Sequence, residues 1–256
     1  MKTICETLEA KKARDTLGLM LYLLGITGYD IEADRASRVS MDLYHDEQVI
    51  EGIANTRLGP KQRTSLMYRA KKGDLRRVKF LTDFGARVDI GDKNGRTAFH
   101  YATEWGQFEM VRWLYTTGVP LTISDKVGWT ALMLASREGD LKLVQWLCTN
   151  EALLDQQSVD GESALSIACK SGHASPIRRH DVVRFLCQSG ASLDLQDNHG
   201  WTALMVASYS GSLHMVITLC ERGANIDLRN RRGTALQIAR DRGHVQVARY
   251  LEERGI

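Results

Sequence analysis

Residues 200–230, Gly-Trp-Thr-Ala-Leu-Met-Val-Ala-Ser-Tyr-Ser-Gly-Ser-Leu-His-Met-Val-Ile-Thr-Leu-Cys-Glu-Arg-Gly-Ala-Asn-Ile-Asp-Leu-Arg-Asn, form the unit that the rest of the chain repeats. The hydroxyl residue near the start of this unit recurs at steps of 33, 33, 33, 39 and 32 residues, at Thr64, Thr97, Thr130, Ser163, Thr202 and Thr234. A glycine follows nine residues after each of them, at Gly73, Gly106, Gly139, Gly172, Gly211 and Gly243. Six units at a nearly fixed period predict a repeat array.

Each unit predicts two short helices. The hydroxyl side chain accepts a hydrogen bond from an amide of the first helical turn, so the first helix begins there. It ends near the glycine nine residues later, because glycine takes the left-handed conformation that closes a helix. The second helix, for example over residues 141–147, has apolar residues at helical spacing. It closes at a second glycine, at Gly85, Gly118, Gly190, Gly223 and Gly255. Glu151 stands at this place in the third unit, where we expect Asn150 to supply the left-handed residue.

This order of helix, turn, helix and hairpin, with Thr-Ala-Leu-Met or Thr-Ala-Phe-His opening the first helix, resembles an ankyrin repeat. The resemblance covers about residues 59–256 and implies an all-α fold with short β-hairpin turns, an ankyrin-repeat α-solenoid. Alanine or serine replaces the family's usual proline, and the family's histidine survives only as His100. The other units carry Met67, Met133, Ser166, Met205 and Gln237 there, which weakens the inter-repeat hydrogen bonds that the resemblance implies.

The predicted domain organisation is an N-terminal helical cap over residues 1–58 and a repeat domain over residues 59–256. The repeats fall at about 59–92, 93–125, 126–157, 158–197, 198–230 and 231–256. Residues 1–34 are either a degenerate repeat or an unrelated capping helix. In both cases the cap covers the open apolar end of the first clear repeat.

Two segments depart from the repeat pattern. The fourth unit has six extra residues, 175–180, which we expect to form a loop at the end opposite the hairpins. Arg178 and Arg179 there make either a secondary basic contact or a tolerated surface insertion. The last unit is rich in arginine, which indicates either a solvated C-terminal cap or a dock for an acidic partner.

Composition bounds the class of protein. The chain has 256 residues, 43% of them hydrophobic, and a net charge of +3, too small to predict a nucleic-acid or membrane partner. Five cysteines without a secretory signal indicate a reducing compartment. The apolar run over residues 17–26 is too short to span a bilayer. We expect an intracellular monomer, in the cytoplasm; the sequence leaves open a nuclear protein or an effector delivered into another cell.

Neither catalysis nor a metal or other cofactor is predicted. Cys148, Cys187 and Cys220 occupy one equivalent position and are expected to pack in the core. Cys169, His173, His180 and Cys187 are residue types that bind zinc, but the helical rise separates His180 from Cys187 by about 10 Å, so the four cannot easily close a tetrahedron. The sequence also lacks the phosphate-binding and nucleophile motifs that would mark an active site.

The predicted binding surface lies on the hairpin tips and on the ends of the first helices. Stacked repeats expose these positions along a concave face, and ankyrin-family proteins generally bind partners there. The residues of this chain at those positions are Arg96, Glu104, Trp105, Trp129, Arg137, Glu138, Glu162, Lys170, His199, Trp201 and Tyr209. Their four aromatic rings are either binding hot spots or, for Trp129 and Trp201, rings packed on the adjoining hairpin.

The leading hypothesis is therefore a scaffold or adaptor module that binds a protein partner through these residues. The alternative is a regulatory or effector protein in which residues 1–58 recruit a second factor while the repeats select the target.

Overall fold

The computed structural model describes residues 55, 57, 59–170 and 175–255. Within these residues the backbone forms twelve α-helices, and its β-structure includes the isolated bridges Ser124–Thr130 and Asn230–Gly233. The chain divides into two compact units, residues 1–101 and 102–256, which are described in turn. The predicted cap over residues 1–58 lies outside the described residues, except for residues 55 and 57.

The first unit contains α4 (Ser65–Lys72), α5 (Leu75–Asp83) and the start of α6 (Ala98–Glu104). Thr64 caps α4: its side-chain oxygen accepts from the amide of Met67 at 3.4 Å, and the Met67 sulfur accepts from the amide of Thr64 at 3.4 Å. Asp74 caps α5 through the amide of Arg77 at 3.1 Å. The helices bury one apolar face, which includes Leu66, Ala70, Val78, Leu81 and Phe99.

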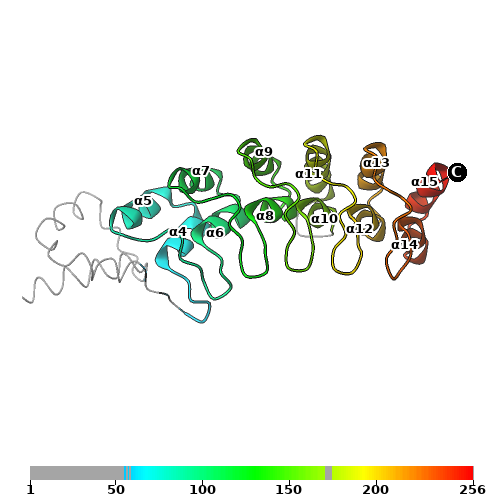
Figure 1. The fold of residues 1–256 in the computed structure, drawn as a ribbon. Coiled ribbons are helices and arrows are strands. Elements are labelled where there is room, and N and C mark those ends of the chain that lie inside the picture. The colour runs from blue at the N-terminus through cyan, green and yellow to red at the C-terminus, as the bar shows by residue number, and fades with distance from the viewer. Residues whose placement is uncertain (1–54, 56, 58, 171–174, 256) are drawn as a thin grey trace, which may run out of the picture. The chain divides into compact units, whose positions relative to one another are not determined.

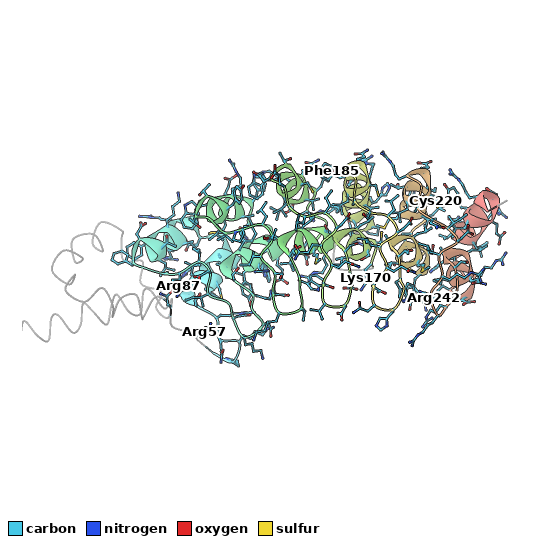
Figure 2. The ribbon with its side chains drawn as sticks, in the orientation of Figure 1. Arg57, Arg87, Lys170, Phe185, Cys220 and Arg242 are labelled. Atoms are coloured by element: carbon cyan, nitrogen blue, oxygen red, sulfur yellow. The ribbon has the colours of Figure 1, made fainter. Side chains whose placement is uncertain are left out.

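The second unit continues the helix pairs. Its helices after α6 are α7 (Phe108–Thr116), α8 (Ala131–Arg137), α9 (Leu141–Thr149), α10 (Ala164–Cys169), α11 (Pro176–Gln188), α12 (Ala203–Tyr209), α13 (Leu213–Glu221), α14 (Ala235–Asp241) and α15 (Val245–Arg254). The first helices α8, α10, α12 and α14 pack side by side in one row, and α9, α11, α13 and α15 pack in a second row (Figure 1). Figure 2 shows Lys170 and Arg242 on the first-helix row, and Phe185 and Cys220 on the second.

Hydroxyl residues start the first helices, as predicted. Thr130, Ser163, Thr202 and Thr234 each accept a hydrogen bond from the amide three residues later, at 3.3–3.4 Å. Two of the residues that replace the family's histidine complete the cap from the other side. The Ser166 hydroxyl accepts from the amide of Ser163 at 3.0 Å, and the Gln237 side chain accepts from the amide of Thr234 at 2.9 Å. These substitutions therefore keep the local cap.

Leucine and alanine at repeating positions form the core between neighbouring repeats. Leu132, Leu165 and Leu204 are each at most 2% exposed, and so are the alanines that precede them. Burying a leucine side chain stabilises a fold by about 1.5–3 kcal/mol. Since each repeat buries its apolar face against the next one, the stability comes from a series of such interfaces.

The prediction for the end of the third unit is wrong. Asn150 caps α9 with φ −98°, and Glu151 takes the left-handed conformation with φ 67°. Gly118, Gly190 and Gly223 have positive φ at the equivalent position, so the repeat imposes this conformation whichever residue stands there. Gly255 follows α15 but has φ −93°, so it ends that helix without a left-handed turn.

The predicted loop in the fourth unit is also wrong, because most of the extra residues are helical. Ser175 caps α11, accepting from the amide of Arg178 at 3.4 Å, and Pro176 occupies the first helical turn. Proline fits there because its missing N–H has no intrahelical partner. Arg178 and Ile177 are exposed, whereas Arg179 is buried and donates to the backbone carbonyl of Lys170. Arg179 thus supports the fold instead of offering a basic surface contact.

Successive hairpins of the second unit are joined through their backbones. The amide of Val159 donates to the carbonyl of Val127 at 2.9 Å, and the amide of Asn198 donates to the carbonyl of Asp160 at 3.0 Å. We call these bonds the tip ladder. Inside a hairpin, an aspartate organises the turn: Asp197 Oδ1 accepts from the amides of His199 at 2.8 Å and Trp201 at 2.9 Å.

Candidate functional site

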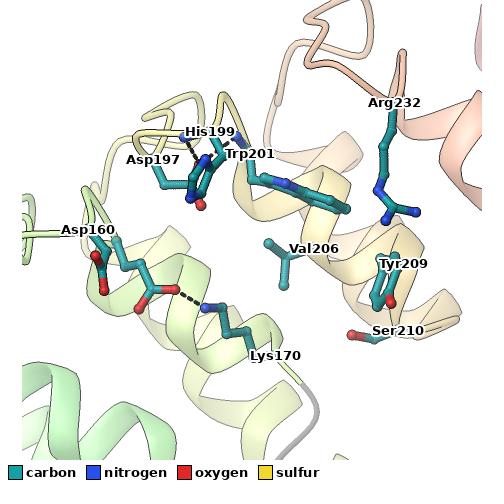
Figure 3. Close-up of a pocket in the computed structure, with 10 residues that line it drawn as sticks. Asp160, Lys170, Asp197, His199, Trp201, Val206, Tyr209, Ser210 and Arg232 are labelled. Carbon is teal, nitrogen blue, oxygen red and sulfur yellow. Dashed lines mark hydrogen bonds and ion pairs between the residues drawn. The ribbon is translucent and has the colours of Figure 1, made fainter.

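A groove of about 600 Å³ lies on the hairpin side of the second unit (Figure 3). This volume falls within the range of roughly 300–1,000 Å³ that ligand pockets occupy. Its walls come from the three hairpins before α10, α12 and α14 and from the ends of the first two of these helices. We call it the hairpin groove, and its residues are Asp160, Glu162, Lys170, Asp197, His199, Trp201, Val206, Tyr209, Ser210 and Arg232.

The middle of the hairpin groove is apolar and aromatic. Val206 on α12 is 7% exposed. The rings of Trp201 and Tyr209 are half-buried and meet edge to face, with centroids 5.5 Å apart and planes at 90°. Such ring pairs contribute about 0.5–1.5 kcal/mol beyond the area that they bury. This pair therefore holds both rings in place while part of each stays open to a ligand.

Two guanidinium groups lie over the Tyr209 ring. The Arg242 guanidinium is 4.3 Å from the ring centroid and the Arg232 guanidinium is 6.0 Å from it. The backbone carbonyl of Tyr209 also lies 3.0 Å from Nε2 of His244, in the last repeat. Tyr209 at the end of α12 therefore contacts the last repeat both through its backbone carbonyl and through its ring.

Carboxylates gather at the other side of the hairpin groove. Glu162 is 8% exposed and forms an ion pair with Lys170 at the end of α10. Asp160 is exposed, and Asp197 is half-buried. In Figure 3, Asp160 and Asp197 lie on one side, Arg232 and Tyr209 on the other, and Trp201 and Val206 between them. The hairpin groove therefore has an acidic side and a basic side.

Three further predicted site residues form an ionic cluster in the same unit. Arg137 on α8 bonds Glu104 at 2.7 Å and Glu138 at 2.8 Å, and its guanidinium lies 5.1 Å from the centroid of the Trp129 ring. Burial opposes the charge of Arg137, but the hydrogen bonds to Glu138 and Glu104 outweigh it and raise its pKa. Trp129 is half-buried beside this cluster. Less of its ring surface is therefore open to a partner than a fully exposed hairpin-tip residue would offer.

The two remaining predicted residues lie elsewhere. Trp105 follows α6 and is 53% exposed. Arg96, in the first unit, lies 4.8 Å from the centroid of the Tyr101 ring, and the Tyr101 hydroxyl donates to Asp92 at 2.8 Å. Burial raises the pKa of Asp92, but hydrogen bonds from Tyr101 and from the amides of Arg96 and Asn94 outweigh it and lower this pKa below its ordinary value. Arg96 is thus part of an organised turn.

Sequence reasoning found five of the residues that line the hairpin groove: Glu162, Lys170, His199, Trp201 and Tyr209. It missed Val206 as a lining residue, since the apolar positions of this helix were expected to face the core. It treated Arg232 as part of the arginine-rich last unit only. The signal was present, because Arg232 stands in the hairpin before α14, where the other repeats have their tip residues.

Of the three cysteines expected to pack in the core, only Cys187 is buried. Cys169 and Cys187 are buried, whereas Cys148 and Cys220 are half-buried instead of lying in the core. Burial raises the pKa of Cys148 and of Cys187 to about 11. His173 lies outside the described residues. His180 Nε2 lies 3.0 Å from the Thr218 hydroxyl, and burial, helped by His214 and Arg184, lowers its pKa.

Among the described residues, no group of three or more histidine, cysteine, aspartate or glutamate side chains is placed to hold a metal ion. None of the helices in this part of the chain combines the length and the apolar character that crossing a membrane requires.

The family model described as ankyrin repeats in three copies matches residues 43–125, 117–197, 155–230 and 174–256. The first of these matches begins before the predicted start of the repeats at residue 59, a boundary that stays a prediction. No curated protein matches the chain. The helix pairs, their hydroxyl caps and the family match agree with the predicted all-α fold, and the chain belongs to the ankyrin-repeat family.

Proposed function

We propose that this chain is a scaffold or adaptor that holds a protein partner in the hairpin groove by non-covalent contacts. Ankyrin repeats are generally protein–protein interaction modules and typically not enzymes. The proposal assigns the chain no catalytic step. It also places the chain in the cytoplasm, a reducing compartment of the kind that five cysteines without a secretory signal indicate.

The proposal rests on one observation: the rings of Trp201 and Tyr209 pack against each other beside Val206, and both remain partly exposed to solvent. Binding hot spots are enriched in tryptophan and tyrosine that sit in a well-packed setting and lose water on binding. The edge-to-face contact at 5.5 Å fixes both rings before a partner arrives. Little side-chain entropy is therefore lost when the partner docks.

The surrounding polar groups favour a protein ligand. A protein surface offers apolar side chains for the rings and charged side chains for the groups on both sides. Shape and polar complementarity would then decide which protein is bound. Trp105, exposed at the end of α6, extends the candidate surface within the second unit.

The test is affinity capture from the native cell with the wild-type chain and single alanine variants. We expect Trp201→Ala and Tyr209→Ala to weaken binding of the main captured protein at least tenfold, the size of effect that marks a hot spot, about 1.4 kcal/mol or more. Trp105→Ala should weaken it less and leave the melting temperature nearly unchanged, because the ring is mostly exposed.

Tyr115→Ala is the matched control. Tyr115 lies on α7 and is 37% exposed, but it does not line the hairpin groove. The proposal fails if Tyr115→Ala weakens capture as much as Tyr209→Ala does. It also fails if the loss of capture by the Trp201 and Tyr209 variants only follows their loss of melting temperature.

A further inference from the structure

We infer that the hairpin groove takes an extended peptide segment with opposite charges at its two ends. An acidic side chain of the segment lies beside Arg232 and Arg242, and a basic side chain lies beside Asp160 and Asp197. This inference rests on the proposed function and names the chemistry of the partner that the hairpin groove selects.

The basic side has two cations without a carboxylate partner. Arg232 and Arg242 are exposed and both lie within 6.0 Å of the centroid of the Tyr209 ring. Within the described part of the chain, neither guanidinium forms an ion pair. Arg229 and Arg231, from the same hairpin as Arg232, are also exposed and add to the positive field. A carboxylate placed here meets planar guanidinium groups, whose paired N–H donors match the two oxygens of a carboxylate.

The acidic side has a surplus of negative charge. Glu162 and Lys170 neutralise each other in an ion pair. Asp160 forms no ion pair or side-chain hydrogen bond with the described residues. Asp197 accepts two backbone amides through Oδ1 but meets no cation in the same part of the chain. A lysine or arginine of the ligand would supply the missing positive charge.

The placement of the two sides on different hairpins favours an extended segment over a single side chain. The acidic residues belong to the hairpins before α10 and α12, and Arg232 belongs to the hairpin before α14. The segment therefore passes three successive hairpins, with an apolar side chain over Trp201 and Val206 in the middle (Figure 3). Opposite charges at the two ends also fix the direction in which the segment lies, because the reversed segment would place like charges together.

The same charge pattern argues against nucleic acid as the occupant. A nucleic acid carries negative charge along its whole length and binds through many phosphate contacts. Its backbone would bind near Arg232 and then run against Asp160 and Asp197. A peptide of mixed charge matches both sides, so the observations favour the peptide.

The experiment uses a display library of random 12-residue peptides, selected on the full chain. We expect the enriched peptides to carry an acidic and a basic residue on either side of an apolar one. One enriched peptide is then synthesised, and its affinity is measured for the wild type, for Arg232→Glu with Arg242→Glu, and for Trp201→Ala. The charge variant should bind at least about tenfold more weakly. A peptide whose acidic residue is changed to lysine should regain most of the affinity for that variant.

Arg249→Glu is the control, because Arg249 on α15 is exposed but does not line the hairpin groove. Binding that needs Trp201 but ignores all charge changes would refute the polarity and leave the proposed function standing. Binding that ignores Trp201 as well would place the peptide outside the hairpin groove and refute both. Selection of uniformly acidic peptides, selection of none, or tighter binding of a 12-nucleotide single strand would each contradict the inference.

Discussion

Alanine at Gly161 should destabilise the fold more than alanine at Gly190, although both glycines have a left-handed backbone. Their φ angles are 79° and 88°. A Cβ atom at Gly190 would have no heavy atom within 4 Å, so Gly190→Ala tests the backbone conformation alone. A Cβ at Gly161 would lie 2.8 Å from the amide nitrogen of Asn198 and 2.9 Å from the Cα of Asp197, closer than such atoms approach in proteins.

The magnitudes follow from these two surroundings. A left-handed residue other than glycine costs roughly 1–2 kcal/mol, and the stiffer unfolded chain of the alanine variant offsets about 0.4–1 kcal/mol of this. Gly190→Ala should therefore cost about 1 kcal/mol. Gly161→Ala adds about 1–3 kcal/mol of overpacking. Two of the obstructing atoms are backbone, and the amide of Asn198 is held by its bond to the carbonyl of Asp160 at 3.0 Å, so this amide cannot move aside without loss of that bond.

Urea unfolding followed by circular dichroism measures both variants against the wild type. The expected result is a loss of unfolding free energy of about 2–4 kcal/mol for Gly161→Ala, with a slope close to that of the wild type. Gly223→Ala, whose Cβ would also meet open space, serves as a second control and should match Gly190→Ala. Equal losses for Gly161→Ala and Gly190→Ala, within about 0.5 kcal/mol, would refute the close approach of the two hairpins.

Three further predictions concern stability in urea. Arg179→Ala should cost about 1–3 kcal/mol because it leaves the backbone carbonyl of Lys170, just after α10, without its buried donor. Arg178→Ala should stay within about 0.5 kcal/mol of the wild type, and similar losses for the two variants would contradict the buried position of Arg179. Glu151→Gly should stabilise the chain by about 0.5–1 kcal/mol by relieving its left-handed conformation, and an unchanged or lower midpoint would speak against that strain. Tyr101→Phe should cost about 1.5–3 kcal/mol at pH 7 by removing a hydrogen bond to a charged carboxylate. The folded pKa of Asp92 lies below its ordinary value of 3.8. The stability that the charged Asp92 contributes is therefore present above pH 3.8 and is lost as the pH falls through the lowered pKa. The difference in unfolding free energy between the wild type and Tyr101→Phe should shrink at about pH 3.

The helix starts were predictable from the sequence because their cause is local. A threonine or serine before an apolar segment accepts an amide three residues later, and Thr130 and Thr202 do this in the structure. The repeat period then carried the prediction to every unit. It also located Trp201 and Tyr209 on the hairpin side, because their places in the unit are fixed relative to the capping threonine.

The wrong predictions concern the end of the third unit and the insertion in the fourth, and the contact between Arg242 and Tyr209 was not predicted. Asn150 has the local preference for a left-handed turn, but the stacking of the repeats places this conformation one residue later, at Glu151. Ser175 and Pro176 are a recognisable helix start, a local signal that outweighs the expectation of a loop for an insertion. The contact between Arg242 and Tyr209 joins two repeats, and the period of the sequence does not state how far apart their side chains lie.

In the tip ladder, backbone atoms keep neighbouring hairpins in register, which leaves most tip side chains available for recognition. Its bonds run from Val159 to Val127 and from Asn198 to Asp160, and both use main-chain atoms only. Any amino acid that tolerates the local backbone can therefore replace a tip side chain without breaking a bond of the ladder. Such a surface can acquire a new specificity through single exchanges at positions 127, 159 and 160, while the scaffold beneath it stays the same. Asn198 is the exception, because its side-chain amide also donates to the carbonyl of Val159 at 2.8 Å.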